Sequence, residues 1–221
     1  METMTLLETK NLRFAYPQGN HFHFPDIKVQ AANSFLISGP SGVGKTTLLH
    51  LLAGILQPTD GEIWINQTNV ASLGGRKLDE FRGKNIGLVL QQNHFIQSLS
   101  VLDNVLMANW LATQQKNVQK AKELLEKLGI ASQQNKATYQ LSVGQQQRLS
   151  IARALINEPK LLLADEPTSS LDDHHAQSVI ALLQELSVAY GASLVVVSHD
   201  QRLKEVIKDT VVLSNQISSN S

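Results

Sequence analysis

The chain has 221 residues, its 19 Lys and Arg balance its 19 Asp and Glu, and it contains no cysteine. The lack of cysteine excludes disulfides, thiolate metal sites and cysteine nucleophiles. A balanced charge is unlike the basic surface by which proteins hold nucleic acid, so we expect no nucleic-acid partner.

The first third of the chain has the residue patterns of short β-strands. They cover residues 6–16, the alternating stretch 21–29, the apolar run 34–38 and residues 61–66. Strands joined by turns predict a small antiparallel layer beside a central sheet. The N-terminal segment lacks the apolar core of a signal peptide, and no apolar run approaches the roughly 20 residues that span a bilayer. We therefore expect a soluble chain that cannot itself form a pore.

The stretch GPSGVGKTT, residues 39–47, follows the run 34–38 and precedes a helix-like segment at 46–54. A G-x-x-x-x-G-K-S/T pattern in this setting predicts a phosphate-binding loop. Its glycines let backbone amides wrap the phosphates, Lys45 reaches the β and γ oxygens, and the Thr46 hydroxyl can bind Mg²⁺. The expected nucleotide-binding residues are Gly39, Pro40, Ser41, Gly42, Val43, Gly44, Lys45, Thr46 and Thr47.

A buried strand is predicted at 86–90, and Gln91 follows it. An amide at this position could contact Mg²⁺ or an attacking water, although such a residue alone is usually a surface residue. Two helices are predicted next, at 101–112 and 118–128. Because no Pro/Gly/Ser linker divides the chain, we interpret residues 92–140, approximately, as a helical insertion in a single domain, 1–221.

The stretch LSVGQQQR, residues 141–148, is predicted to be a tight Ser-x-Gly turn that opens a helix at 145–156. A helix N-terminus can bind anions because its first amides are unpaired, so the chain has a second candidate anion site.

Two acids follow the continuous apolar run 161–164, which predicts a buried parallel strand. Asp165 suits a magnesium shell, and Glu166 is free to orient a water for attack on a γ-phosphate. Alternatively, the two acids have no catalytic role and cap a turn before Pro167. A later apolar strand is predicted at 193–198, and His199 follows it directly. A lone histidine at such a position is more often structural than catalytic.

The remaining elements of the last third are helices at 176–188 and 201–207 and a strand at 210–214. Helices that alternate with apolar strands predict βα units and a mainly parallel sheet, with ligands at the carboxyl ends of its strands. The predicted fold class is therefore α/β, a phosphate-loop NTPase with a mainly parallel central sheet, an antiparallel β layer and a helical insertion.

The order of these motifs, from the phosphate loop through Gln91, LSVGQQQR and LLLADEPTSSLD to SHD, resembles the ATP-binding cassette (ABC) ATPases over residues 6–213. The sequence around these motifs is most similar to the ATPase subunits of lipoprotein-release and macrolide-export transporters. In that family two cassettes pair head to tail, and each ATP lies between the phosphate loop of one copy and the LSVGQQQR-type turn of the other. The second anion site would then serve the nucleotide of the other copy.

The resemblance implies further roles for individual residues. Tyr16 would stack on adenine, although it could also be an ordinary strand aromatic. Ser142 and Gly144 would contact the opposite γ-phosphate, and Asp172 would cross the dimer interface. Val143 departs from the family, which usually has glycine there. Glycine adopts positive φ freely and valine does not. Either Val143 therefore has negative φ with its side chain directed away from the phosphate, or this site is weakened, and we favour the first alternative.

We therefore expect the ATPase subunit of an ABC transporter that uses ATP and Mg²⁺. Its expected catalytic residues are Lys45, Gln91, Glu166 and His199, and its expected metal ligands are Thr46, Gln91 and Asp165. The resemblance implies an integral membrane permease as partner, a homodimer or heterodimer of ATPase subunits, and a peripheral position at the cytoplasmic face of the inner membrane.

Two other functions are alternatives: an ABC ATPase that acts on nucleic acid or ribosomes, and a phosphate-loop kinase or GTPase. The second lacks the N-K-x-D pattern that selects guanine. We interpret His21 and His23 as one face of a strand and residues 172–175 as a solvated helix start, not as metal sites. Phe95 and Ile96 could dock a membrane partner or pack in the core.

Overall fold

The computed structural model describes residues 4–17, 19–168, 173–200 and 202–214. Its centre is a parallel sheet with the strand order β10-β4-β9-β8-β7. The strands are β4 (Ser34–Ser38), β7 (Ile86–Val89), β8 (Leu161–Asp165), β9 (Ser193–Ser198) and β10 (Asp209–Val212). The predicted parallel sheet is confirmed, because every pair of neighbouring strands in it is parallel.

A second sheet is antiparallel and is built by the first third of the chain. It contains β1 (Thr5–Ala15), β2 (His21–His23), β3 (Lys28–Gln30), β5 (Asp60–Ile65) and β6 (Thr68–Asn69). The predicted antiparallel layer is confirmed, but the stretch 21–29 is not one strand. It forms β2 and β3, which pair with different parts of β1. Pro25 lies between them, and proline cannot donate a ladder hydrogen bond.

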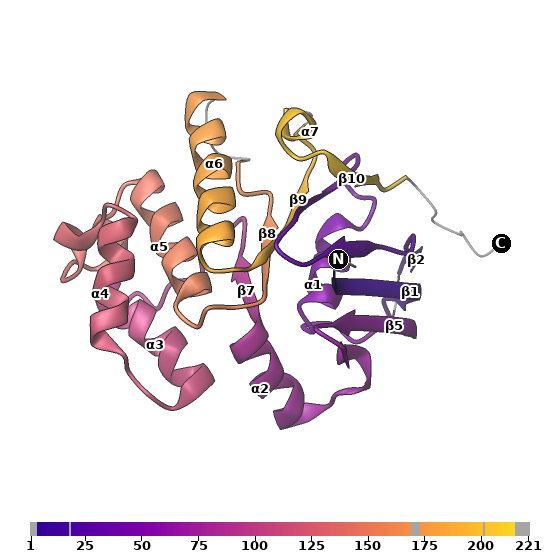
Figure 1. Ribbon diagram of the computed structural model, residues 1–221, viewed down its shortest axis with the longest axis horizontal. Helices are drawn as coiled ribbons and strands as arrows, with labels where there is room; N and C mark the ends of the chain where they lie inside the picture. The colour runs from indigo at the N-terminus through magenta and orange to yellow at the C-terminus, as the bar shows by residue number, and fades with distance from the viewer. Residues whose placement is uncertain (1–3, 18, 169–172, 201, 215–221) are drawn as a thin grey trace.

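Helices cover the other side of the parallel sheet (Figure 1). They are α3 (Val101–Thr113), α4 (Val118–Lys127), α5 (Val143–Leu155) and α6 (Asp173–Ala189), while α1 (Lys45–Leu52) lies on the side of the antiparallel sheet. The short α7 (Leu203–Val206) leads into β10. Helices α3 and α4 lie inside the stretch 92–140 and α5 packs on both of them, while the limits of an inserted subdomain remain a prediction.

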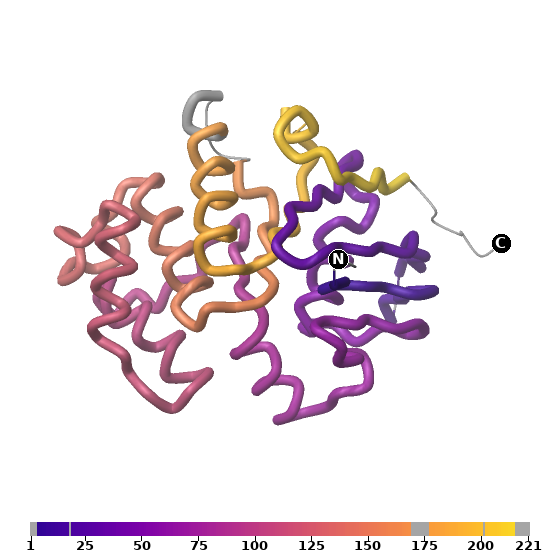
Figure 2. The backbone as a smooth tube through the Cα atoms, viewed as in Figure 1, coloured from indigo at the N-terminus to yellow at the C-terminus, as the bar shows by residue number. Residues whose placement is uncertain are grey.

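Alternate residues of the central strands supply two separate hydrophobic cores. Phe35 and Ile37 of β4 face α1 and the antiparallel sheet, whereas Leu36 between them faces the helices. The same alternation holds in β8 and β9, as expected for strands that are covered on both faces. The backbone tube in Figure 2 shows the yellow C-terminal segment returning to the early part of the chain, where β10 pairs with β4. The carboxyl ends of β4, β8 and β9 therefore meet at one edge.

One helix was not predicted. Helix α2 (Gly75–Asn85) precedes β7 and buries only Leu78 among its side chains. Arg82 Nη1 donates to the carbonyl of Gly54, at 3.1 Å, and this bond ties α2 to the end of α1. Its only other apolar side chain, Phe81, is partly buried against the same core. Two apolar residues are too few to establish a helical period, so the sequence pattern did not predict this helix.

Candidate functional site

The phosphate loop, residues 39–46, connects β4 to α1 as predicted. Gly44 is the N-cap of α1 with a φ of 93°, in the left-handed region that favours glycine. A Cβ at this position would also lie 2.7 Å from the ring of Phe22. At the start of the loop, a Cβ on Gly39 would lie 2.6 Å from the carbonyl oxygen of Leu213. Conformation and close packing therefore both select glycine here.

Lys45 is 7% exposed and its ammonium group is held by the loop itself. Its Nζ donates to the carbonyl oxygens of Gly39, at 3.0 Å, and Pro40, at 2.9 Å. It also lies 3.7 Å from Oε1 of Glu166. These acceptors compensate a charge that would otherwise be costly to bury, and they place the ammonium group beside the acids that end β8.

Asp165 is the last residue of β8 and is buried. The Thr46 hydroxyl donates to its Oδ1 at 3.4 Å. Burial raises the pKa of the Asp165 carboxyl above its usual value, the hydrogen bond from Thr46 opposes this shift, and the nearby charge of Glu166 adds to it. A carboxylate and a hydroxyl on neighbouring strand and helix ends are hard oxygen donors of the kind that Mg²⁺ prefers, so these residues fit the expected cation.

In the described part of the chain, no group of three or more His, Cys, Asp or Glu side chains could hold a metal ion. A magnesium site can use one or two carboxylates and take its other ligands from phosphates and water. Gln91 follows β7 and lines the same pocket as Thr46.

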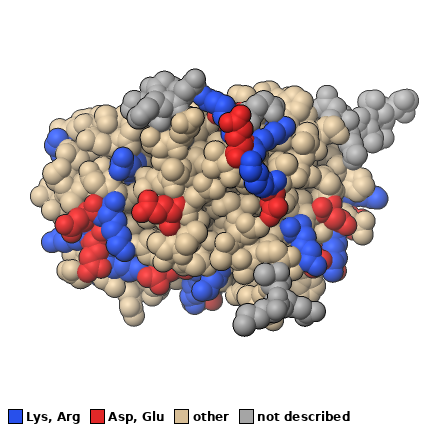
Figure 3. All heavy atoms as spheres, turned by 45° about the horizontal axis from the view of Figure 1, so that its top comes forward, with Lys and Arg blue, Asp and Glu red and all other residues tan. Residues whose placement is uncertain are grey.

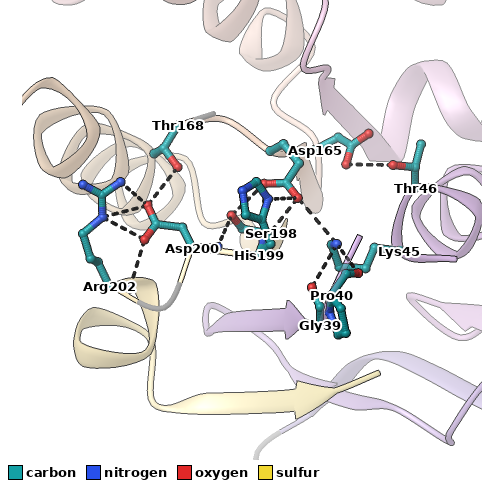
Figure 4. Close-up of polar contacts among 11 residues, drawn as sticks. Gly39, Pro40, Lys45, Thr46, Asp165, Thr168, Ser198, His199, Asp200 and Arg202 are labelled. Atoms are coloured by element: carbon teal, nitrogen blue, oxygen red, sulfur yellow. Dashed lines mark hydrogen bonds and ion pairs between the residues drawn. The ribbon is translucent and has the colours of Figure 1, made fainter. Parts of the chain in front are cut away.

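Glu166 has a φ of 45°, a conformation that is uncommon for a residue with a side chain. Its carboxylate accepts a hydrogen bond from Ser198 Oγ, at 2.8 Å, and its Oε1 lies 2.8 Å from His199 Nδ1. The backbone N–H of His199 also donates to Oε1, at 3.2 Å. Strand register brings the end of β9 beside Glu166, so its carboxylate has hydrogen-bond partners that the sequence did not suggest, while its expected role in orienting a water stays a prediction. Figure 4 shows Lys45 and His199 on opposite sides of the polar cluster that follows the end of β8.

A pocket of about 340 Å³ gathers most of the predicted residues. It is lined by Phe22, Ser41, Gly42, Gly44, Lys45, Thr46, Thr47, Gln91, Glu166 and His199. Val43 is different because its side chain is buried in the core beside α1, so only its backbone can face a ligand. The structure thus brings together segments that follow β4, β7, β8 and β9, as the parallel topology predicts.

Tyr16 lies at the rim of this pocket and is 41% exposed. Its hydroxyl lies 3.2 Å from Oγ1 of Thr47, and its ring meets that of Phe14 edge to face at 4.7 Å. These contacts hold a partly exposed aromatic face next to the phosphate loop. They are compatible with stacking on a base.

The turn at 141–148, which we call the signature turn, is separate from this pocket. Ser142 is the N-cap of α5 and forms a capping box with Gln145, so the helix starts at Val143 and not at 145. Val143 is not among the residues with positive φ, which confirms the backbone part of the alternative we favoured. Its side chain is 59% exposed, and its direction relative to a phosphate stays a prediction. Ser142 and Gly144 line a different pocket of about 460 Å³ between α5 and α6.

The sequence analysis did not propose three residues that lie at or near the site, and one proposed residue is outside the described part of the chain. Phe22 was interpreted only as part of an alternating strand, although it lines the phosphate pocket. Ser198 and Asp200 flank His199 in the motif SHD, and that proximity was the available signal. Asp200 accepts bonds from Arg202 and Thr168. Asp172 lies outside the described residues.

Comparisons with known proteins match this arrangement. The family described as ABC transporter matches residues 23–169. The lipoprotein-releasing system ATP-binding protein LolD of Syntrophotalea carbinolica is 36% identical over 90% of each chain. The macrolide export ATP-binding/permease protein MacB of Rhodopirellula baltica is 38% identical over 88% of this chain but only 30% of its own length.

Solved structures agree with the sequence comparisons. A dimeric, post-hydrolysis state of the ATP-binding cassette MJ0796, bound to ADP and Pi, superposes with a TM-score of 0.84 at 30% identity, and the match covers 98% of each chain.

Proposed function

Because the chain belongs to the ABC transporter family, we propose that it is the ATP-hydrolysing subunit of a membrane transport complex and that the phosphate-loop pocket is its hydrolytic site. One observation carries the assignment to these residues. The phosphate loop, Asp165, Glu166 and His199 meet at the carboxyl ends of three parallel strands and are joined by polar contacts of 2.8, 3.4 and 3.7 Å.

The residues have separate roles in this proposal. The amides of the phosphate loop and Lys45 hold the phosphates, and Tyr16 supports the base. Thr46, Asp165 and Gln91 hold Mg²⁺, which neutralises charge on the phosphate oxygens when it is bound. Glu166 accepts a proton from the attacking water, and His199 orients Glu166 and the γ-phosphate.

The charge of Lys45 is important for the change between states. In the described arrangement, Glu166 is one of its counterions. Phosphate oxygens carry more charge than a carboxylate and compete for the same ammonium group. Lys45 therefore moves from Glu166 to the nucleotide, and this leaves the carboxylate more available to water.

The experiment for the hydrolytic role is Glu166→Gln, with Glu126→Gln on the exposed side of α4 as a matched control. A positioned base contributes a factor of roughly 10² to 10⁴, so ATP turnover should fall by about that factor while ATP binding remains. The variant should accumulate as an ATP-bound dimer on gel filtration, and the control should behave as wild type. Near-normal turnover of Glu166→Gln would remove this residue from the role.

The partner we propose is an integral membrane permease, with this chain bound at the cytoplasmic face of the inner membrane. No helix in the described residues is long and apolar enough to cross a membrane. The matched MacB relative is named as an ATP-binding and permease protein in one. A pairing of ATPase chains is supported by the dimeric cassette structures. In that pairing, Ser142 and Gly144 face the nucleotide of the second chain.

A groove of about 830 Å³ between α2, β7, α3 and α5 is the proposed docking site for the permease. Its lining combines small residues, exposed apolar ones such as Ile55 and Leu111, and the cations Arg82 and Arg153. Arg153 is fixed by a bond to the carbonyl of His94, at 2.7 Å, and lies over the ring of Phe95. Phe95 packs partly in the helical core, whereas Ile96 is 43% exposed.

The docking site is tested with Leu111→Asp, which places a charge on a 65% exposed residue of the groove. Val188→Asp on α6, where the side chain is 70% exposed, is the matched control. Co-purification with the membrane protein in mild detergent should be lost only for Leu111→Asp, with the fold intact in both. Equal retention of the membrane protein by both variants would argue against this groove.

The alternative of a nucleic-acid-acting ATPase is not favoured. On the face drawn in Figure 3, the described Lys and Arg side chains are interspersed with Asp and Glu over a largely uncharged surface. A protein that binds nucleic acid without base readout depends on a cluster of positive charge. The relatives reported above are named for transport instead.

A further inference from the structure

We infer that Ser198 is a positioning residue for hydrolysis: it holds one oxygen of the Glu166 carboxylate so that the other faces the attacking water. The inference rests on the proposed role of Glu166 as the base. It adds a residue for which the sequence had suggested no function.

Ser198 is in the most constrained part of the parallel sheet. It is the last residue of β9, the central strand, it is paired with Ser38 of β4, and its exposure is 0%. On the other side, Val197 is in register with Asp165 of β8. The backbone N–H of Glu166 donates to the carbonyl of Val197, at 2.8 Å. Strand pairing therefore fixes the Ser198 hydroxyl relative to Glu166.

The direction of the Ser198 hydroxyl proton follows from its contacts. A serine hydroxyl has one proton to donate and two lone pairs to accept with. The backbone N–H of Asp200 donates to Ser198 Oγ at 3.1 Å. The proton of Ser198 is thus available for Glu166 Oε2, at 2.8 Å. This is a short, buried hydrogen bond to a charged acceptor, which belongs to the stronger class in proteins.

The other side-chain donors near Glu166 have a second task. Lys45 lies 3.7 Å from Oε1 and the proposed function assigns it to the phosphates. The His199 side chain, 56% exposed, also contacts Oε1 and faces the pocket. When a nucleotide binds, Lys45 leaves Oε1, and the His199 side chain is shared between Oε1 and the γ-phosphate. The Ser198 hydroxyl contacts Oε2 and lines no part of the phosphate pocket, so it keeps the carboxylate oriented.

Asp200 supports this arrangement from behind. Its carboxylate accepts bonds from Arg202 Nε, at 2.8 Å, and from Arg202 Nη2, at 2.6 Å (Figure 4). The hydroxyl of Thr168 also donates to it, at 3.4 Å. These bonds hold Asp200 in place, and its backbone N–H donates to Ser198 Oγ. The direction of the Ser198 hydroxyl is therefore set by contacts within the folded chain.

The test compares Ser198→Ala with Ser193→Ala. Ser193 is at the opposite end of β9, is equally buried, and donates to the carbonyl of Gln30 at 3.1 Å, so its variant removes a similar hydroxyl away from Glu166. Misplacement of a reacting group by about 1 Å can cost 10²-fold. We expect kcat of Ser198→Ala to fall about 10- to 100-fold, with KM and the affinity for a fluorescent ATP analogue changed less than threefold. The ATP-bound dimer should persist on gel filtration, as for Glu166→Gln.

Ser198→Thr keeps the hydroxyl and should recover most of the lost kcat, whereas Ser193→Ala should remain close to wild type. If Ser198→Thr does not fold, the comparison of the two alanine variants decides. Turnover of Ser198→Ala within twofold of wild type, beside an inactive Glu166→Gln, would overturn this inference alone. An equal loss of kcat in both alanine variants, or a loss confined to nucleotide binding, would also overturn it. An active Glu166→Gln would instead refute the proposed function.

Discussion

At the scale of single residues, the clearest conflict between folding and function is the buried carboxyl of Asp165. Burial raises its pKa, which means that the folded state without a cation favours the protonated form. The protonated carboxyl contributes stability that is fully present below the unfolded-state pKa of about 3.9. That contribution is lost as the pH rises through the higher pKa of the folded state. At neutral pH the ionised group therefore costs stability, which a bound cation would offset.

Asp165→Asn should accordingly raise the Tm of the nucleotide-free chain at pH 7, because asparagine cannot ionise and keeps the bond from Thr46. Magnesium-dependent hydrolysis should be lost in the same variant. The difference in Tm from wild type should shrink as the pH is lowered towards the ordinary pKa of aspartate. Thermal unfolding across pH measures this, with Glu126→Gln at an exposed position of α4 as control. A lower Tm for Asp165→Asn at pH 7 would contradict the assignment of a destabilising charge.

Val143 provides a second prediction at this scale. It is the first residue of α5 and 59% of it is exposed, so its side chain neither strains the turn nor packs in the core. Val143→Gly should change ATPase activity by less than about threefold, and it should lower stability by about 0.5–1 kcal/mol because glycine has more freedom in the unfolded chain. Steady-state ATPase assays and urea unfolding check this. A large gain in activity would show that valine weakens the site.

At the scale of elements, the strands that carry the acids and His199 were predictable. Residues 161–164 and 194–197 are continuous apolar runs, and the structure has β8 and β9 there within one residue at each end. Chain order also placed the phosphate loop between a strand and a helix. What no local pattern contains is register. The pairing of Asp165 with Val197 brings Ser198 to Glu166, and this is why the engaged state of Glu166 was missed.

Helix α2 was missed for a related reason. Its stability depends on tertiary contacts more than on its own sequence, since only Leu78 is buried. The Asn157 side chain lies beyond the end of α5 and joins α2 to α3. Its Nδ2 donates to the carbonyls of Gly83 and Ala108, both at 3.2 Å, while its Oδ1 accepts from Asn109 Nδ2 at 3.0 Å.

Asn157→Ala should therefore destabilise the chain by about 1–2 kcal/mol, because three polar groups lose a partner in a half-buried site. Urea unfolding measures the change, with the exposed Asn135→Ala as control. Since these bonds connect α2 and α3, which border the docking groove, the variant should also co-purify less membrane protein. Unchanged stability would show that water replaces the asparagine fully.

At the scale of the whole molecule, the chain contains two anion sites that do not meet. The phosphate loop and the signature turn line different pockets. A head-to-tail pair of chains would join each loop to the turn of the other copy. The arrangement can be tested with two variants that damage one site each. Lys45→Ala removes the ammonium group of the phosphate loop. Gly144→Asp adds a carboxylate at a position with open space around it, where it would repel a γ-phosphate.

Each variant alone should be nearly inactive. In a mixed dimer of the two, the trans arrangement puts both defects into one composite site and leaves the other with an intact loop and an intact turn. If each chain used its own turn, neither site would be whole. Mixing the inactive proteins, with the permease present if pairing needs it, should therefore restore part of the ATP hydrolysis.

Strict coupling between the two sites could hide this rescue, so wild type mixed with each variant is measured in parallel to show how well one sound site works. Suppose that wild type mixed with each variant hydrolyses ATP, but the mixture of Lys45→Ala and Gly144→Asp does not. The signature turn would then not serve the nucleotide of a second copy. Recovery of up to about half the activity of one sound site follows from random pairing, because half of the dimers then contain one variant of each kind. Complementation is thereby distinguished from a trace of wild-type contaminant, whose activity would already be present in the separate preparation that carries it.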